Sequence, residues 1–306
     1  MVLAAGRGER MRPLSDVVPK PALPMPGRPL VGWALGSACG AGARRVVVNT
    51  WHLAARMEQA LRACEWGGDA VVSHEERLMG TGGGLALARD RGLLAGTAPV
   101  LVINGDCVLE LDLEPLVRRH LGSRDLVTLA LLPHPDPGRW SQVLLTPSGG
   151  VERFVAVGGS SAGREPFLYC GAMLVSRTAL EAIPKAVGGV AEMLWQAALA
   201  AGRLGGTVVR GRWLEVGSPA AYLDAVQELL GGASTVAEQA EVATDAEVDS
   251  SLVGAGAQIR GQASVRRSVV AEGAVVGRNA RVLRSVLMGT VEVAEGEFVR
   301  DEFMAR

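Results

Sequence analysis

The amino-acid sequence predicts an α/β domain built on a mainly parallel sheet, followed by a β-solenoid. Up to about residue 230, short apolar runs alternate with amphipathic ones. Beyond that point the spacing of the aliphatic residues changes, and the pair Gly231-Gly232 stands at the change. A chain of 306 residues is long enough for two hydrophobic cores. We therefore expect one domain over residues 1–231 and a second over residues 232–306.

The first region reads as strands alternating with helices. β-branched and apolar runs predict strands at 45–50, 69–73, 99–105, 125–132 and 167–175. Apolar residues spaced three to four apart predict helices at 53–63, 113–122, 190–202 and 220–230. Such alternation is typical of a Rossmann-like, mainly parallel sheet covered by helices on both faces.

The second region repeats every 17 residues, with serine at 234, 251, 268 and 285. Aliphatic residues stand two, eight and fourteen positions after each serine: Val236, Val242, Val248, Val253, Ile259, Val265, Val270, Val276, Val282, Leu287, Val293 and Val299. A six-residue beat suits neither a helix nor an ordinary strand, and it predicts a triangular solenoid with one short strand on each face. This pattern resembles the left-handed parallel β-helix of hexapeptide-repeat proteins. A flexible Ala/Gly/Val-rich tail is disfavoured because every expected position matches.

Composition excludes several classes of protein. A net charge of −1 provides no basic field for nucleic acid. No window of about 18 uninterrupted apolar residues suggests a membrane span, so we expect neither nucleic acid nor membrane as a partner. The four cysteines (39, 64, 107 and 170) have no CxxC spacing, which indicates neither a disulfide framework nor a zinc site. A reducing, cytoplasmic location is expected.

The opening segment LAAGRGERMRPLS, followed by PKP, is the candidate phosphate-binding loop. Its small residues let backbone N–H groups approach a polyphosphate closely, and the two glycines have no Cβ atom in the way; these residues are Ala4, Ala5, Gly6 and Gly8. Arg10 and Lys20 supply the positive charge that a triphosphate requires. The P-loop pattern is absent, and so is the third glycine of a dinucleotide fingerprint. Taken alone, the glycine pair could equally be a turn without a special role.

The longer string resembles the signature of sugar-1-phosphate nucleotidylyltransferases, in particular mannose-1-phosphate guanylyltransferases and N-acetylmuramate-1-phosphate uridylyltransferases. The resemblance continues through the segments 80–84, 104–106 and 213–223. It implies that the chain joins a nucleoside triphosphate to a sugar-1-phosphate and releases pyrophosphate. By this resemblance Arg10 stabilises the transition state and Lys20 holds phosphate.

The predicted metal ligand is Asp106, which follows the apolar strand at 99–105. At the carboxyl edge of an open α/β sheet, a carboxylate can hold Mg²⁺ together with substrate phosphates. The resemblance implies a second carboxylate at Glu215, where the family usually has aspartate, so the longer side chain departs from the pattern. For each acid the alternative is a solvated or helix-capping carboxylate.

The nucleobase and sugar contacts are less well defined. We expect Asn104 and the backbone of Gly80, Thr81 and Gly82 to contact the nucleotide, although a strand-to-helix turn would explain the same glycines. The segment MGTGGG is intermediate between the motifs of the family's guanylyltransferases and uridylyltransferases. The sequence therefore leaves both GTP and UTP as candidate substrates. The family's E-K-P lysine is missing here. Four residues lie where its sugar pocket would be: Trp140, Ser141, Cys170 and Gly171.

The implied reaction needs no general base, because a phosphate monoester is already anionic near neutral pH. The repeat region contains no histidine, which disfavours a solenoid acyltransferase. We expect the solenoid to serve assembly, through a homo-oligomer, or regulation. The rival interpretation is a catalytically silent paralogue that binds a nucleotide-sugar. Glu215 and the missing E-K-P favour it slightly, whereas the intact Arg10, Lys20 and Asp106 oppose it.

Overall fold

The computed structural model describes residues 1–306. The chain forms two compact units, each assembled from separate stretches of sequence. Unit 1 consists of residues 1–6, 32–51 and 65–213, and unit 2 of residues 7–31, 52–64 and 214–306. The predicted boundary at residue 231 stays a prediction.

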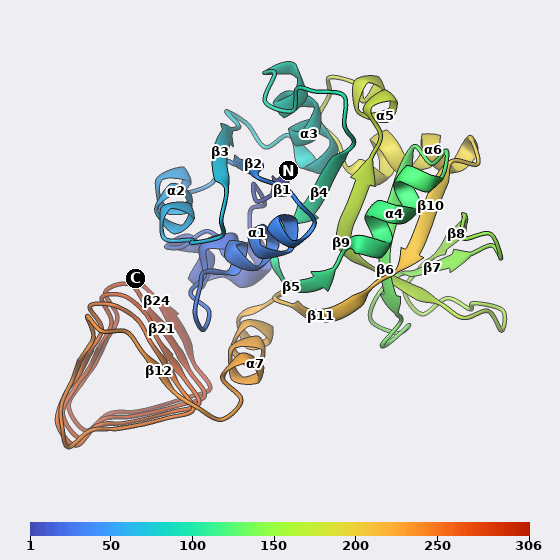
Figure 1. Ribbon diagram of the computed structural model, residues 1–306. Helices are drawn as coiled ribbons and strands as arrows, with labels where there is room; N and C mark the ends of the chain where they lie inside the picture. The colour runs from blue at the N-terminus through green and yellow to red at the C-terminus, as the bar shows by residue number, and fades with distance from the viewer. The chain divides into compact units, whose positions relative to one another are not determined.

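Unit 1 is built on a nine-stranded sheet (Figure 1). Seven strands lie side by side in the order β10 (Leu204–Val208), β6 (Val127–Pro133), β9 (Phe167–Val175), β4 (Val100–Asn104), β1 (Val2–Leu3), β2 (Arg45–Thr50) and β3 (Asp69–His74). Strands β7 (Gln142–Leu145) and β8 (Val151–Val155) extend from β9. All neighbours on the main path are parallel except β9, which runs antiparallel to β4 and β6. The predicted mainly parallel sheet is confirmed.

Helices cover both faces of this sheet. The main core joins the sheet to α3 (Gly80–Asp90), α5 (Arg177–Ala182), the π-helix η4 (Ala191–Trp195) and α6 (Gln196–Ala200). Side chains alternate between the two faces along a strand. Leu129 of β6 faces this core, whereas the neighbouring Thr128 faces the other way and contacts His120 of α4 (Glu114–Gly122). Helix α4 therefore lies on the opposite face.

The remaining elements of the α/β region are short. Strands β5 (Cys107–Asp112) and β11 (Arg210–Glu215) form a separate two-stranded sheet. In helix α1 (Leu30–Gly40), the Ser37 hydroxyl donates to the Leu109 carbonyl at 2.8 Å. Helices α2 (Ala54–Arg62) and α7 (Pro219–Leu230) belong to unit 2. The predicted strands and helices are all present. The segment predicted as one helix over 190–202 is η4 followed by α6.

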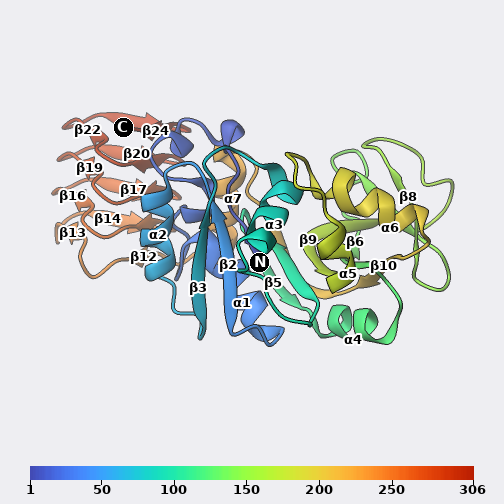
Figure 2. The ribbon, with the colours of Figure 1, turned by 90° about the horizontal axis from the view of Figure 1, so that it is seen from above.

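The repeat region of unit 2 is a triangular stack of parallel strands, the predicted left-handed β-helix (Figures 1 and 2). One face carries β12 (Thr235–Val236), β15 (Leu252–Val253), β18 (Val269–Val270), β21 (Val286–Met288) and β24 (Phe303–Ala305). The second carries β13 (Glu241–Val242), β16 (Gln258–Ile259), β19 (Val275–Val276) and β22 (Glu292–Val293). The third carries β14 (Glu247–Asp249), β17 (Ser264–Arg266), β20 (Arg281–Leu283) and β23 (Phe298–Arg300).

The predicted inward positions form the core of the stack. In the three later coils all nine are buried, from Val253 to Val299. The first coil differs, because no coil lies beyond it: Val236 is 44 % exposed, and Val242 and Val248 are partly buried. The edge of this first coil is therefore an uncovered apolar end.

The recurring serines form a hydrogen-bonded ladder along one corner of the stack. Each of Ser251, Ser268 and Ser285 is fully buried and donates its hydroxyl to the carbonyl two residues before it, at 2.7–2.9 Å. The same hydroxyl accepts from an N–H one coil further on, at 3.1 Å. The residue before each serine has a positive φ, 45° to 49° at Ser250, Arg267 and Arg284. The 17-residue period thus reflects a repeated corner turn.

Replacing Ser268 with alanine should destabilise the solenoid. The change leaves the buried Ser285 N–H without its acceptor, which costs about 1–3 kcal/mol for an unsatisfied buried group, whereas the Arg266 carbonyl keeps the Arg284 N–H as a donor. Urea denaturation should show a lower midpoint for this variant. Ser264, in the same coil, bonds to Glu247 on the exposed surface, so Ser264→Ala is the matched control. Equal midpoints for the two variants would contradict a structural role for the ladder.

Candidate active site

In unit 1, the neighbouring strands β1 and β4 place the predicted phosphate-binding residues and the predicted metal ligand Asp106 at one edge of the sheet. Leu3 of β1 pairs with Asn104 of β4, and the Gly105 N–H donates to the Leu3 carbonyl at 2.9 Å. The segments 4–6 and 105–106 therefore leave the sheet side by side at its carboxyl edge, where open α/β sheets bind ligands. Asp106 is half-buried, and the Cys107 thiol lies 3.5 Å from its Oδ1.

Of the residues predicted for the sugar pocket, Gly171 lies beside Asn104 at this edge, whereas Cys170 is in the core. Gly171 of β9 has a φ of +93°, and a Cβ there would lie 3.1 Å from the Asn104 amide nitrogen, so the backbone of β9 closes on Asn104. Trp140 packs edge-on against Trp213, with ring centroids 5.3 Å apart. Cys170 belongs to the core instead: its thiol is fully buried and donates to the Ala130 carbonyl, and burial raises its pKa to about 12.

The rest of the predicted phosphate loop belongs to unit 2, where it is a chain of short 3₁₀ turns. Gly8 has a φ of +65° and precedes η1 (Glu9–Met11); Arg10 within this turn is exposed. The Ser15 hydroxyl, in η2 (Leu14–Asp16), donates to the Gly8 carbonyl at 2.8 Å and closes the loop. Lys20 begins η3 (Lys20–Ala22), and its Cβ would lie 3.6 Å from a Cβ added at Gly8. Gly8 and Lys20 are therefore neighbours.

Other parts of unit 2 hold this loop in place. The ring of His52 lies 3.0 Å from the Ser15 carbonyl, and the Tyr222 hydroxyl of α7 donates to the Pro24 carbonyl at 2.6 Å. The last strand of the solenoid, β24, contacts η2. The solenoid and the loop that carries Arg10 therefore belong to one compact unit.

The glycine run at 80–84 opens helix α3 and packs tightly against the segment 186–190. The N–H groups of Gly82 and Gly83 donate to the Gly188 carbonyl at 2.9 and 3.1 Å. The Thr81 hydroxyl accepts from the Val190 N–H at 2.9 Å. A Cβ at Gly80 would lie 2.6 Å from the Gly188 carbonyl oxygen. Close packing accounts for these glycines, and base contacts by Gly80, Thr81 and Gly82 stay a prediction.

Glu215 ends strand β11 and is half-buried; a Cβ added at Gly217 would lie 3.0 Å from its Oε1. No group of three or more histidine, cysteine, aspartate or glutamate side chains is arranged to hold a metal ion. The predicted metal ligands, Asp106 and Glu215, are two separate carboxylates. Such a set suits Mg²⁺, which takes one or two carboxylates and completes its shell with substrate phosphates and water.

The predicted residues thus fall into two sets. Unit 1 brings together Ala4, Ala5, Gly6, Asn104 and Asp106 at one sheet edge. Unit 2 brings together Gly8, Arg10 and Lys20 in one loop and holds Glu215 at the end of β11. The roles of all these residues stay predictions.

Sequence reasoning gave no role to two buried polar side chains beside these sets, Asn49 and Glu75. The available signal was a polar residue inside or directly after a run of apolar strand residues.

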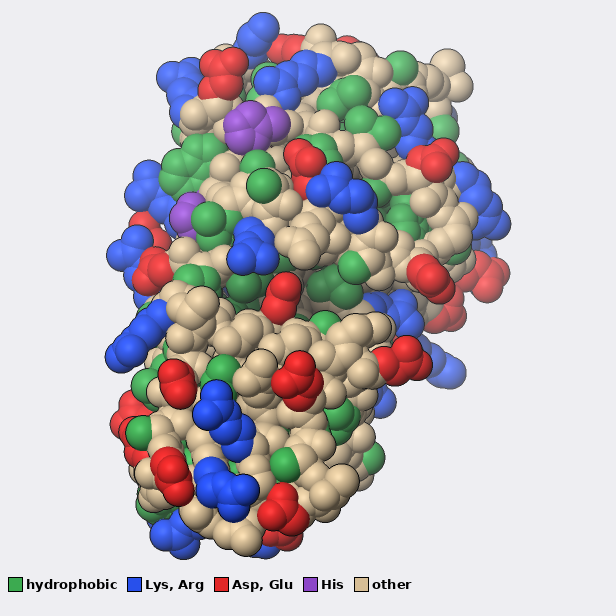
Figure 3. Space-filling model, turned by 90° about the vertical axis from the view of Figure 1, so that its left-hand side faces the viewer, with side chains coloured by type: hydrophobic (Ala, Val, Ile, Leu, Met, Phe, Trp, Pro, Cys, Tyr) green, Lys and Arg blue, Asp and Glu red, His purple; other side chains and the backbone are tan.

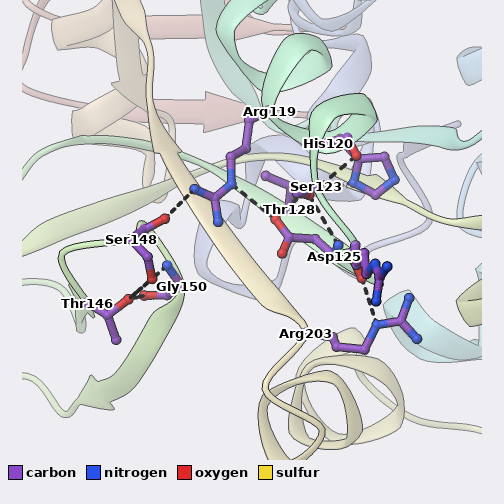
Figure 4. Close-up of polar contacts among 10 residues, drawn as sticks. Arg119, His120, Ser123, Asp125, Thr128, Thr146, Ser148, Gly150 and Arg203 are labelled. Atoms are coloured by element: carbon purple, nitrogen blue, oxygen red, sulfur yellow. Dashed lines mark hydrogen bonds and ion pairs between the residues drawn. The ribbon is translucent and has the colours of Figure 1, made fainter.

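A groove of about 520 Å³ lies elsewhere in unit 1 and contains none of the predicted residues; it is lined by Pro115, Arg118, Arg119, Gly122, Ser123, Ser148 and Thr207. A polar network beneath it ties α4 to the sheet (Figure 4). Arg119 Nε donates to Asp125 at 3.2 Å, and the Thr128 hydroxyl donates to the same carboxylate oxygen. His120 Nδ1 lies 2.8 Å from that hydroxyl.

Lowering the pH should destabilise unit 1 through His120. Burial lowers the pKa of this imidazole below its usual 6.5, and Asp125 opposes the shift only in part. The unfolded chain takes up a proton near pH 6.5 while folded His120 stays neutral, so stability is present above that pH and lost as the pH falls below it. Urea midpoints at about pH 7.5 and about pH 5 should fall less for His120→Asn than for the wild type. His74, which is exposed, provides the control His74→Asn.

On the surface, charges of both signs are interspersed. The face in Figure 3 shows acidic and basic side chains next to one another, without a single basic field. None of the helices combines the length and the apolar character needed to cross a bilayer.

Comparison with known proteins agrees with this geometry. The model of the family described as "Nucleotidyl transferase" matches residues 1–231, and the model described as "GlmU-like, C-terminal hexapeptide" matches residues 222–302. An N-acetylmuramate alpha-1-phosphate uridylyltransferase of Neisseria meningitidis serogroup B is 43% identical over 114 residues, which cover 37% of this chain and 48% of the relative. A mannose-1-phosphate guanylyltransferase catalytic subunit beta of Drosophila pseudoobscura pseudoobscura is 26% identical over 225 residues, 73% of this chain and 60% of the relative.

The chain thus spans about half to three fifths of the length of these relatives. The nucleotidyl transferase model, however, covers well over half of the chain itself, including the loop after β1 and the Asp106 edge. This chain belongs to the nucleotidyl transferase family and carries a GlmU-like hexapeptide β-helix at its C-terminal end.

Proposed function

We propose that this protein is a sugar-1-phosphate nucleotidylyltransferase that forms an NDP-sugar from a nucleoside triphosphate and a sugar-1-phosphate. One observation carries the proposal. Strands β1 and β4 end together, so a small-residue loop and the carboxylate of Asp106 leave the same edge of the sheet. That edge is where open α/β sheets bind nucleotides. Family membership supports the same conclusion.

In the proposed reaction an oxygen of the sugar phosphate attacks the α-phosphorus of the triphosphate. A new P–O bond forms, the bond to the bridging oxygen of the β-phosphate breaks, and pyrophosphate leaves in line with the attack. The attacking oxygen is already anionic near neutral pH, so no side chain has to remove a proton. Catalysis then depends on position and on charge neutralisation, for which Arg10 and Lys20 are the proposed groups.

Magnesium is the proposed cofactor. Asp106 would hold it together with phosphate oxygens of the nucleotide, and Glu215 would complete the site as a second carboxylate. When bound, the ion neutralises negative charge on the phosphates. The backbone N–H groups of Ala5, Gly6 and Gly8 would receive the phosphate oxygens, since these positions carry little or no side chain. Ala4 would open this loop, with its own N–H held by Asn49 Oδ1. Asn104, Gly80, Thr81 and Gly82 are the proposed contacts to the nucleoside.

A mannose-1-phosphate guanylyltransferase-like activity is the form we propose first. Several relatives named as mannose-1-phosphate guanylyltransferases or guanyltransferases align with 73% of the chain and one with 51%, whereas the uridylyltransferase relative aligns with 37% at higher identity. GTP and UTP are therefore the two triphosphates to compare. The GlmU-like tail and the exposed inward face of the first coil support a homo-oligomer formed through the β-helix. A cytoplasmic location belongs to the same proposal, because scattered free cysteines fit a reducing compartment.

A panel assay tests the function. The protein is incubated with each of the four triphosphates and with mannose-1-phosphate, N-acetylmuramate-1-phosphate or glucose-1-phosphate in the presence of Mg²⁺, and pyrophosphate release is measured. We expect turnover with GTP or UTP and one of these sugars. Tight binding of an NDP-sugar without turnover of any pair would instead favour the silent nucleotide-sugar-binding paralogue. Glu215 and the missing E-K-P lysine are the features that make this alternative worth testing.

A further inference from the structure

A buried pair of polar side chains, Asn49 and Glu75, lies behind the predicted phosphate loop in unit 1. Asn49 is the penultimate residue of β2 and is 3% exposed. Glu75 directly follows β3 and is 0% exposed. Burying a polar group without partners is costly, and burying a carboxylate is more so. A fully buried glutamate at this position therefore calls for an explanation in the contacts that it makes.

The pair forms a continuous hydrogen-bond chain between two backbone segments. The Ala4 N–H donates to Asn49 Oδ1 at 2.8 Å, and Asn49 Nδ2 donates to Glu75 Oε1 at 2.7 Å. The Met79 N–H donates to Glu75 Oε2 at 2.8 Å. Ala4 is the first residue after β1 and opens the predicted phosphate loop, and Met79 directly precedes helix α3. Two side chains thus join the phosphate loop to the start of the glycine-rich helix.

Few other pairs of side chains at positions 49 and 75 could complete these three hydrogen bonds. Both ends are backbone N–H donors, so each end needs an acceptor. One donor must lie between the two side chains, and Asn49 supplies it through its amide nitrogen. An Asn–Gln pair would set two donors against each other at one of the three contacts. An Asp–Glu pair would set two carboxylates against each other. The reversed pair, Asp at 49 and Gln at 75, satisfies every contact again.

Helix α3 is built to approach this pair. A Cβ at Gly84 would lie 2.6 Å from Glu75 Oε1 and 2.8 Å from Asn49 Nδ2, so only glycine fits there. On its other side the same helix start is held by the Gly188 carbonyl, which accepts from the N–H groups of Gly82 and Gly83. The first turn of α3 is therefore clamped between the Asn49–Glu75 pair and the segment 186–190.

We infer that Asn49 and Glu75 are positioning residues that set the phosphate loop in register with the first turn of α3. The inference rests on the proposed function, in which these two segments receive the phosphates and the nucleoside. The pair acts through the Ala4 and Met79 backbone and does not take part in the chemical step. Its loss should therefore weaken binding of the triphosphate more than it slows turnover at saturation.

Three variants test this inference: Asn49→Asp, Glu75→Gln and the double exchange N49D/E75Q. Each single change places like groups in contact inside the core and should raise KM for the triphosphate about tenfold to a hundredfold, with a smaller change in kcat. The double exchange restores all three hydrogen bonds with one of them reversed. Its KM should return to within about threefold of the wild type.

A matched control separates positioning from general stability. Thr128→Val breaks another buried polar network of unit 1, in which the Thr128 hydroxyl bonds to both His120 and Asp125 (Figure 4). It should lower the thermal midpoint and leave KM for the triphosphate unchanged. Gly84→Ala, which crowds the pair directly, should instead raise KM as the single exchanges do.

The outcomes distinguish this inference from the proposed function. If the wild type releases no pyrophosphate with any substrate pair, the function fails, and the variants are compared by calorimetric binding of GTP and UTP. If the wild type is active or binds a triphosphate, and the double exchange is as weak as the sum of the two single changes, the inference is overturned. A KM shift in Thr128→Val equal to that of the single exchanges would also overturn it.

Discussion

Arg10→Ala should lower kcat for NDP-sugar formation about a hundredfold to a thousandfold and leave the fold intact. The expected size follows from the loss of one charged donor at a transition state where negative charge develops on phosphate oxygens. Arg10 is exposed in η1, so removing its side chain opens no cavity. Steady-state pyrophosphate release at saturating substrates measures kcat, and far-ultraviolet circular dichroism checks the fold.

Arg7 is the matched control for this experiment. It is exposed in the same loop and forms an ion pair with Glu9 at 3.2 Å. Surface ion pairs contribute little, so Arg7→Ala should change kcat by no more than about twofold. Arg10→Lys keeps the charge without the planar fork and should recover part of the loss. Equal rates for Arg7→Ala and Arg10→Ala would remove Arg10 from the proposed chemistry.

Asp106→Asn should have an effect of similar or greater size. Asparagine keeps the volume and one oxygen but removes the negative charge that holds a divalent cation beside the phosphates, which is worth several kcal/mol and hence about a thousandfold or more in rate. Residual activity should require a higher Mg²⁺ concentration than in the wild type. Titrating Mg²⁺ into the metal-stripped enzyme while following pyrophosphate measures both quantities.

Asp112→Asn provides the comparison. Asp112 ends the neighbouring strand β5, is exposed, and accepts from the Glu114 N–H at the start of α4 at 3.0 Å, a bond that asparagine can keep. Its variant should titrate with Mg²⁺ as the wild type does. An Asp106→Asn protein with unchanged rate and unchanged Mg²⁺ dependence would exclude this carboxylate from the metal site.

Much of the architecture could be predicted because it follows from local periodicity. Strand β2 and strand β9 have the predicted bounds, since runs of β-branched and apolar residues suit a strand buried on both faces. The solenoid was predictable because each coil repeats the one before it, so the same inward aliphatic position recurs twelve times in the sequence. Its serines were visible as a period, but their role as a hydrogen-bonded ladder was not.

The glycine run illustrates where sequence reasoning was incomplete. The segment 80–84 suggested backbone contacts to a nucleobase. The structure accounts for its glycines by close approaches within the chain: to Gly188 for Gly80, to Met193 and Gly189 for Gly82, to Ala186 for Gly83, and to Glu75 for Gly84. A sequence pattern shows that a position needs glycine. It does not say which group lies close, because that group comes from a segment far away along the chain.

The sequence by itself determined the fold class, the repeat of the solenoid, the candidate loop after β1 and the acid at the end of β4. These depend on spacing between near neighbours, which short-range sterics and burial enforce. Only the tertiary structure decided that Asn49 and Glu75 join the Ala4 and Met79 backbones, and that the solenoid's last strand contacts the turn holding Ser15. Apart from the Glu75–Met79 contact, which spans four positions, these contacts join residues tens to hundreds of positions apart. No local pattern of a single sequence records which distant donor meets which acceptor.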